Sequence, residues 1–196
     1  VKQKQFHICI KKIRSKTKIP LIIFPGSREQ ISKKADAILL LSLISGRNPD
    51  FLIGEHVLAA KKLKNSKLEI VPTGYLLINR GKKSATQNIT KTSPIKSTNN
   101  KLAAATAMAG ELLGMKLIYL EGGSGAHNPV PYAMIREVKQ TISVPLLVGG
   151  GIDSNEKATQ ALKAGADVIV VGNGAEKNIS IISKIANTVK NFKFAP

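Results

Sequence analysis

The sequence has little that could cross-link the chain or hold a metal. It contains a single cysteine, Cys9, among 196 residues, which excludes a disulfide framework and is typical of a reducing compartment such as the cytoplasm. The three histidines stand apart from one another and from Cys9, so no group has the spacing of a metal site. No apolar run reaches 18 residues, and the interrupted apolar residues near the start do not form a signal peptide. We therefore expect a cytoplasmic protein without a membrane span.

Acidic and aromatic residues are also scarce. The chain has 30 lysines and arginines against 12 acidic residues, a formal net charge of +18, and 4% aromatic residues with no tryptophan. Such an excess of positive charge favours an anionic partner, whether nucleic acid, an acidic membrane surface or a phosphorylated substrate. Because the lysines are scattered and few rings are available to stack on bases, nucleic acid is not expected as a partner. Codon bias explains the composition as well, and peripheral membrane contact stays open.

Short apolar runs alternate with helical patterns, which is the rhythm of parallel βαβ units. Each run is continuous in apolar residues, as expected for strands that are buried on both faces. The strands predicted in this way are 21–24, 37–43, 68–71, 117–120, 145–148 and 167–171.

Periodic apolar residues predict helices near both ends of the chain. The residues expected to share a helix face are Phe6, Ile10 and Ile13 near the start, and Ile182, Ile185, Ala186 and Val189 near the end. Between these helices, Asp153 and Glu156 are predicted to cap a helix that Gly165 would end.

Two architectures fit this number of strands. A closed (β/α)8 TIM barrel needs eight strands and about 250 residues, whereas six strands are enough for an open doubly wound sheet. The glycine-rich turns follow the last predicted strands, which is where phosphate-binding barrels have them. We therefore predict an α/β protein whose residues 1–196 form a single TIM-barrel domain lacking its first two βα units. The first residue, Val1 rather than methionine, agrees with this expectation.

One polar segment interrupts the alternation. Residues 79–100 are rich in lysine, threonine and serine, and a loop of that length in a compact domain is usually functional or disordered. It leaves the carboxyl end of a predicted strand, the edge at which barrel active sites lie. We interpret it either as a lid over the site or as a tolerated insertion.

Three glycine-rich turns follow three consecutive predicted strands. Glycine allows backbone N–H groups to approach a ligand closely, and a helix amino terminus favours an anion. Together the second and third turns predict a phosphate cradle of the kind found after the last strands of many barrels. The turns are Tyr119-Leu120-Glu121-Gly122-Gly123-Ser124-Gly125, Gly149-Gly150-Gly151-Ile152 and Gly172-Asn173-Gly174.

The first turn also contains a carboxylate. Glu121 ends a predicted strand and is followed by two glycines, so its side chain can accept a proton from a substrate hydroxyl. The alternative is a structural role in which Glu121 accepts hydrogen bonds from backbone N–H groups. Tyr119 lies two residues earlier and therefore points to the same side of the strand. It is predicted to bind the ligand, with a core position as the alternative.

These turns resemble a known family. The segments YLEGGSGA from Tyr119, PLLVGGGI from Pro145 and IVVGN from Ile169 are similar to the geranylgeranylglyceryl phosphate synthases and their heptaprenyl relatives. IPLIIFPGS, ADAILLLSLISGRNP and EIVPTGYLLIN resemble the third, fourth and fifth strand regions of that family. The resemblance therefore extends from about Lys18 to Asn178.

The resemblance implies a Mg²⁺-dependent prenyltransferase of ether-lipid biosynthesis. It would join a long allylic prenyl diphosphate, such as geranylgeranyl diphosphate, to the 3-hydroxyl of sn-glycerol 1-phosphate. The implied site for sn-glycerol 1-phosphate consists of residues 119–125 with Gly149, Gly150, Gly172 and Asn173. Glu121 falls where the family has a carboxylate that contacts the glycerol hydroxyls, which makes it the candidate catalytic base. The family also implies a homo-oligomer.

Other expectations concern the donor. Leucine and isoleucine side chains toward the barrel mouth would surround the prenyl tail, and Tyr75 is a candidate to touch it, with plain core packing as the alternative. The family's metal-binding aspartate lies on the first strand and a hydroxyl residue for the diphosphate follows the second. We predict neither strand here, so we expect no metal ligand within this chain. Ser27 also carries a hydroxyl group, but the residues around it resemble the family's third strand region rather than the segment after its second strand.

Two alternative functions stay open. One is another phosphate-binding barrel, such as an isomerase or an aldolase-like enzyme, which would be favoured by a catalytic lysine or a second carboxylate facing Glu121. The other is a truncated, non-catalytic relative that binds anions through its charge.

Overall fold

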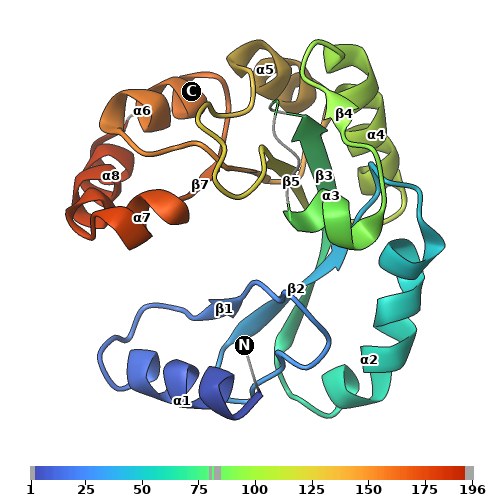
Figure 1. The fold of residues 1–196 in the computed structure, drawn as a ribbon, viewed down its shortest axis with the longest axis vertical. Helices are drawn as coiled ribbons and strands as arrows, with labels where there is room; N and C mark the ends of the chain where they lie inside the picture. The colour runs from blue at the N-terminus through green and yellow to red at the C-terminus, as the bar shows by residue number, and fades with distance from the viewer. Residues whose placement is uncertain (1–2, 80, 82–84, 193–196) are drawn as a thin grey trace.

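The computed structural model describes residues 3–79, 81 and 85–192, and a curled parallel sheet runs through it (Figure 1). The strands pair in the order β1-β2-β3-β5-β6-β7, with the short β4 on β3, and every pair is parallel. Their bounds are β1 (Ile22–Ile23), β2 (Ala37–Ser42), β3 (Glu69–Asn79), β4 (Ile95–Lys96), β5 (Leu117–Glu121), β6 (Leu146–Gly149) and β7 (Val168–Val170).

The helices that connect the strands lie on the outer side of the curl (Figure 1). Their bounds are α1 (Gln3–Arg14), the π-helical turn η1 (Asp50–Gly54), α2 (Glu55–Lys64), α3 (Ala85–Thr90), α4 (Asn100–Leu112), α5 (Tyr132–Thr141), α6 (Asn155–Lys163), α7 (Asn173–Lys177) and α8 (Ser180–Asn191). Parallel strands that pair in chain order, with helices outside, are the arrangement of a (β/α) barrel. The predicted α/β barrel class is confirmed, and the open doubly wound sheet is excluded because its helices would cover both faces.

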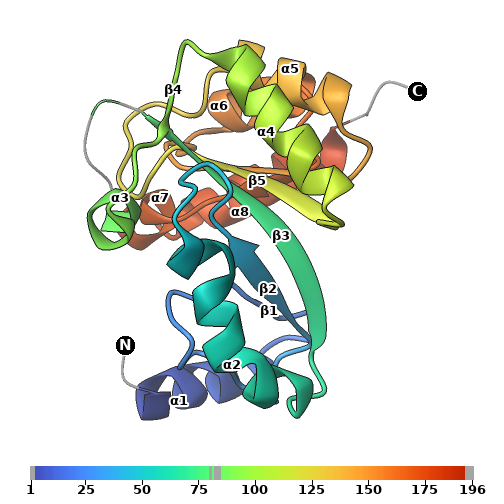
Figure 2. The same cartoon turned by 90° about the vertical axis from the view of Figure 1, so that its right-hand side faces the viewer.

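Among the described residues the sheet does not close on itself, because β1 pairs with β2 alone and β7 with β6 alone. Figure 1 shows the resulting C shape, with α1 and α7 on the two sides of its opening. Figure 2 shows the long strand β3 curving through the molecule from the side of α2 to the side of α4.

Most predicted strands agree with the structure to within one residue at each end, but the strand predicted at 68–71 was too short. Strand β3 continues to Asn79 through Pro72 and Gly74, two residues that usually mark a strand's end. It continues because β2 and β5 pair with it on both sides. Gly74 serves close packing here, since a Cβ on it would lie 2.8 Å from the side chain of Ile118 and 2.9 Å from that of Ile44.

The segment 79–100, interpreted as a loop, contains helix α3 and strand β4; residues 80 and 82–84 lie outside the described ones. Strand β4 pairs with the end of β3, and its Ile95 is buried in the core. Asn48 Nδ2 donates a 3.0 Å hydrogen bond to the Thr90 carbonyl and thereby holds the end of α3. The described part of this segment is therefore integrated into the fold.

The predicted helix faces at the two ends were only partly right. In α1, Ile10 is buried and Phe6 packs beside it, whereas Ile13 is exposed. In α8 the core-facing residues are Ile181, Ile185 and Val189, while Ile182 and Ala186 are exposed. The prediction combined two neighbouring stripes of the helix, and the structure buries the one with a strict four-residue spacing.

The predicted cap of α6 was off by one residue. Ser154, not Asp153, caps this helix by accepting a 3.3 Å hydrogen bond from the N–H of Lys157. Gly165 follows the helix with a positive φ of 108°, which confirms its predicted role as the residue at which the helix stops.

Side chains on the sheet alternate between two layers. Ile118 and Leu120 point outward into the core beneath α4, α5, α6 and α8, whereas Tyr75 and Tyr119 point into the interior of the curl. This alternation places every second residue at the end of β5 inside the curl, where the candidate site lies. No helix among the described residues is both long enough and apolar enough to span a membrane.

Candidate active site

The carboxyl ends of β5, β6 and β7 surround a cavity of about 620 Å³. All three glycine-rich turns contribute to its wall, together with Phe24, which follows β1, and Tyr75 on β3. The predicted site residues that line it are Tyr119, Glu121, Ser124, Gly125, Gly150, Gly172 and Asn173. The structure therefore brings most of the predicted site together on one face, as expected from the common edge at which parallel strands end; what this face binds stays a prediction.

Four other predicted site residues lie behind the cavity wall. The side chain of Leu120 is fully buried in the outer core layer, so the expectation that it reaches the ligand is wrong for its side chain. Gly122 and Gly123 are buried, and the N–H of Gly122 donates a 2.9 Å hydrogen bond to the Gly149 carbonyl. A Cβ on Gly149 would collide with the Tyr119 hydroxyl. These three glycines therefore hold the first two turns against each other.

Asn173 connects the first turn to the third. Its Oδ1 accepts hydrogen bonds from the Ser124 hydroxyl at 3.0 Å and from the Gly125 N–H at 2.8 Å. Its Nδ2 donates to Glu176 Oε2 at 3.2 Å. Gly172, just before α7, has no atom within 4 Å of the position where a Cβ would lie. The space beside Gly172 is thus open to a ligand, and α7 begins there without a side-chain cap.

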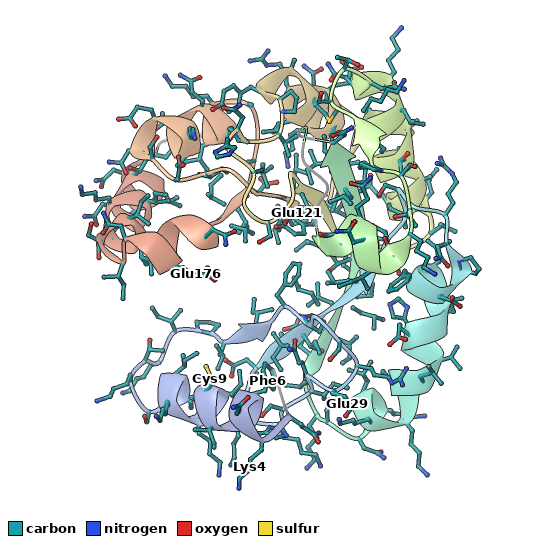
Figure 3. The ribbon with its side chains drawn as sticks, viewed as in Figure 1. Lys4, Phe6, Cys9, Glu29, Glu121 and Glu176 are labelled. Atoms are coloured by element: carbon teal, nitrogen blue, oxygen red, sulfur yellow. The ribbon has the colours of Figure 1, made fainter. Side chains whose placement is uncertain are left out.

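Glu121 points into the curl from the end of β5 (Figure 3). Its Oε2 accepts a hydrogen bond from the Tyr119 hydroxyl, and its Oε1 accepts one of 2.6 Å from the Gly123 N–H. Burial raises the pKa of Glu121 above its usual value, although both hydrogen bonds act in the opposite direction. Burial and the neighbouring Glu121 carboxylate also raise the pKa of Tyr119. A buried carboxylate with a raised pKa is a stronger base than an exposed one, so both predicted roles of Glu121, proton acceptor and acceptor of backbone hydrogen bonds, fit its surroundings.

Three aromatic rings meet beside Glu121. The ring centroid of Phe24 lies 5.5 Å from that of Tyr119 and 6.3 Å from that of Tyr75, and the two tyrosine rings are 5.3 Å apart. Phe24 follows β1 and Tyr75 lies on β3, so three separate strand regions supply the cluster. The sequence indicated both tyrosines but not Phe24, although its place directly before the PGS turn was a usable signal.

A second cavity, of about 420 Å³, adjoins the first and shares Phe24, Tyr75 and Thr86 with it. Its wall is mainly apolar and comes from β2, the turn after β1, η1 and α2; it includes Ile38, Leu39, Leu41, Leu43 and Phe51. Ser27, Arg28 and His56 add polar groups that we did not predict to belong together. His56 Nε2 lies 2.9 Å from the Leu41 carbonyl, which orients its ring.

Helix α3 borders both cavities. Thr86 lines the two of them, and Ile89 and Thr90 line the apolar one. The segment predicted to be a lid therefore lies where a lid would have to lie, and whether it opens stays a prediction.

The described residues do not form a metal centre by themselves. No group of three or more histidine, cysteine, aspartate or glutamate side chains converges within this part of the chain. Of the carboxylates that line the larger cavity, Glu121 accepts the two hydrogen bonds described above, and Asp153 pairs with Lys157 Nζ at 2.8 Å. Because Mg²⁺ prefers several free oxygen ligands, these side chains are not a ligand set for it.

Comparison with known proteins identifies the family. The sequence matches the PcrB family over residues 1–190. The chain belongs to the PcrB family. It is 53% identical over 180 residues to the geranylgeranylglyceryl phosphate synthase of Spirosoma linguale, covering 92% of this chain and 72% of that protein. It is 46% identical over 172 residues to the enzyme of the same name from Pyrococcus furiosus, covering 88% and 68%. The predicted family resemblance is confirmed.

Two solved structures share the fold of this chain. The wild-type GGGPS from Thermoplasma volcanium has a TM-score of 0.91 and 34% sequence identity, covering 100% of this chain and 79% of that one. The (S)-3-O-geranylgeranylglyceryl phosphate synthase from Thermoplasma acidophilum, in complex with substrate sn-glycerol-1-phosphate, has a TM-score of 0.90 and 34% identity, covering 97% and 76%.

Proposed function

We propose that this protein is a prenyltransferase of ether-lipid synthesis. It would join a prenyl group, with geranylgeranyl as the first candidate, to the 3-hydroxyl of sn-glycerol 1-phosphate. The names of its relatives and the ligand of the Thermoplasma acidophilum structure support this function. The observation that carries it is the junction of two unlike cavities, one lined by glycine turns and one mainly apolar, which share Phe24, Tyr75 and Thr86. A reaction between a small phosphate ester and a prenyl chain needs this combination.

In this proposal the glycine-lined cavity binds the acceptor. The phosphate would lie beside Gly150 and Gly172, where backbone N–H groups approach a ligand without an intervening side chain. The described residues lining this cavity include no lysine or arginine. Specificity for the phosphate would then depend on the geometry of the turns rather than on a cationic side chain.

Glu121 would act as the base. As the oxygen of the glycerol 3-hydroxyl attacks the allylic carbon, its proton passes to the Glu121 carboxylate, the new C–O bond forms and the bond from carbon to the diphosphate breaks. The Tyr119 hydroxyl, which donates to Glu121 Oε2, would keep the carboxylate pointing into the cavity. Positive charge develops on the allylic carbon as diphosphate leaves, and aromatic ring faces stabilise such charge. The three-ring cluster lies at the junction where this carbon would have to be.

The prenyl chain would occupy the apolar cavity. Tyr75 is 7% exposed and lines both cavities, so contact with the chain and packing in the interior are both compatible with its place. We retain Mg²⁺ as a proposed cofactor on the resemblance alone, because the described residues supply no ligand set for it, and no step above runs through it. The homo-oligomeric state and the cytoplasmic location likewise stay predictions.

An isomerase or aldolase-like reaction is less well supported. An aldolase of the Schiff-base type needs a lysine amine in the cavity, and no lysine is among the described residues that line it. The nearby Lys157 Nζ donates to Asp153 and, at 2.9 Å, to the His127 carbonyl. The non-catalytic alternative differs from a transferase only in whether product forms.

Two measurements test the proposal. Calorimetric titration should detect binding of sn-glycerol 1-phosphate and far weaker binding of glycerol. Incubation of the chain, extended by a relative's first two βα units, with labelled sn-glycerol 1-phosphate, geranylgeranyl diphosphate and Mg²⁺ should transfer the label into an extractable prenyl ether. Equal binding of glycerol would contradict the acceptor site, and binding without any ether product, in the chain alone and in the chain extended by a relative's first βα units, would favour the non-catalytic relative.

A further inference from the structure

The outward face of η1 and α2 carries apolar side chains where a surface helix is normally polar. Ile53, Val57 and Leu58 are 59%, 66% and 64% exposed. Ile53 and Val57 are four residues apart and therefore lie on one side, with Leu58 beside them. The inward face of the same helix is also apolar, because Ala59 and Leu63 are buried in the core. The exposed residues are thus not needed for packing within the chain, and adjoining exposed apolar side chains of this kind mark interaction sites.

Lysines continue this outward face. Lys61 and Lys64 follow Val57 by four and seven residues, so they share its side of the helix. Neither has an ion-pair partner among the described residues, whereas Lys62 pairs with Glu29 at 3.6 Å. The acidic residue in α2, Glu55, is neutralised by Arg28 at 3.2 Å. We call Ile53, Val57, Leu58, Lys61 and Lys64 the docking face.

The docking face lies beside the apolar cavity. The opposite side of the same helix supplies Glu55, His56, Ala59 and Leu63 to the cavity wall. Ile89 on α3, another wall residue of that cavity, is 70% exposed. Figure 2 shows α2 on the outer surface of the molecule.

We propose that the docking face binds the surface of an anionic lipid bilayer. A helix segment with apolar side chains and flanking lysines lies in the interface, with the apolar groups among the acyl chains and the lysines among the headgroups. The net charge of +18 adds attraction to such a surface. This proposal does not require the prenyltransferase function, although a lipid-like donor would reach the apolar cavity most easily from a bilayer.

Charge favours a bilayer over a second copy of the chain. In a symmetric dimer the same patch meets itself, and the docking face contains no acidic side chain that could balance Lys61 and Lys64 of the other copy. An anionic headgroup layer balances the same lysines. The arrangement of charge therefore fits lipid better than it fits self-association.

Vesicle co-sedimentation tests the proposal. The protein should sediment with vesicles of phosphatidylcholine containing about 30% phosphatidylglycerol, and high salt should weaken this binding. The double substitution Val57→Ser, Leu58→Ser should lower the partition coefficient about tenfold or more, because both apolar groups enter the interface. Lys61→Gln with Lys64→Gln should lower binding to anionic vesicles and leave the weak binding to pure phosphatidylcholine unchanged.

A matched control comes from the end of α4. Leu112 and Leu113 are 82% and 76% exposed, so Leu112→Ser with Leu113→Ser removes similar apolar area from another surface and should leave vesicle binding unchanged. Melting curves should be the same for all variants, because every substituted side chain is exposed. Equal losses from the α2 and α4 variants would overturn the proposal. So would a change of sedimentation coefficient in the Val57→Ser, Leu58→Ser protein with unaltered vesicle binding, which would make this face a subunit contact.

Discussion

Replacing Gly150 by alanine would put a methyl group where the first two glycine turns touch. Gly150 has a φ of +80°, and a Cβ on it would lie 2.7 Å from Glu121 Oε1 and 2.9 Å from the Gly122 nitrogen. Neither atom can move freely. Glu121 Oε1 is held by the Gly123 N–H, and the Gly122 N–H donates to the Gly149 carbonyl. The methyl group would therefore strain both turns.

Two costs add up in this variant. An L-residue in the left-handed region costs about 1–2 kcal/mol, and forcing an extra methyl group into a packed site costs about 1–3 kcal/mol. The free energy of unfolding should thus fall by about 2–5 kcal/mol, and the melting temperature by about 4–20 °C for a chain of this size.

Gly114→Ala separates these two costs. Gly114 also has a positive φ, of +90°, but nothing lies within 4 Å of its added Cβ. This variant should lose only the conformational part, about 1–2 kcal/mol. Gly172→Ala adds no steric contact, because the space beside it is open, but its backbone (φ −111°, ψ −102°) lies outside the helical and extended regions. It should therefore cost about 1–3 kcal/mol of conformational strain, and its methyl group should weaken binding of sn-glycerol 1-phosphate. Denaturant unfolding measures the stabilities. If Gly150→Ala lowers the free energy of unfolding no more than Gly114→Ala does, the first two glycine turns do not pack as closely as the structure shows.

Three further predictions concern Glu121 and the donor side. In the chain extended by a relative's first two βα units, Glu121→Gln should lower kcat about 10²–10⁴-fold and leave the dissociation constant for sn-glycerol 1-phosphate nearly unchanged; a near-normal rate would refute the role as base. Because burial raises the pKa of Glu121 in the folded protein, its ionisation should destabilise the fold as pH rises from the usual glutamate value through the raised one, while the rate rises over the same interval. Denaturation at several pH values should show this loss of stability in the parent and not in the Gln variant. From the resemblance we also expect little prenyl transfer by residues 1–196 alone and Mg²⁺-dependent transfer once a relative's first two βα units are joined to them; robust transfer by the chain alone would contradict this.

The parts of the fold that the sequence predicted well are those governed by local pattern. Continuous apolar runs located β5, β6 and β7, because strands buried on both faces leave no polar residue in the run. Alternation along β5 then predicted that Tyr119 and Glu121 point to one side, although the site implied by the resemblance also included Leu120, which the same alternation buries on the other side. Prediction from local signals failed where tertiary contacts outweigh them.

Strand β3 and the segment after it illustrate that failure. Pro72 and Gly74 indicate a strand end, but pairing with two neighbours carries β3 past both. In 79–100 the polar composition indicates a loop, yet β4 exists because Ile95 is buried against the sheet, and the end of α3 is held by Asn48 from a distant turn. Neither contact leaves a periodic pattern in the segment itself.

The candidate site shows the same division. Its glycine turns could be predicted, because consecutive parallel strands must end at one edge. Its place before the PGS turn puts Phe24 at a strand end, but its contact with Tyr119 could not be predicted, because β1 is separated from β5 in the sheet by β2 and β3 and the order of the strands does not say how far the sheet curls. The curl brings the Phe24 ring to 5.5 Å from that of Tyr119. Phe24 belongs to the wall of the apolar cavity, and Tyr119 is the side chain that donates a hydrogen bond to Glu121. The curvature of the sheet, more than any single motif, therefore brings the proposed donor and acceptor sites together beside the proposed base.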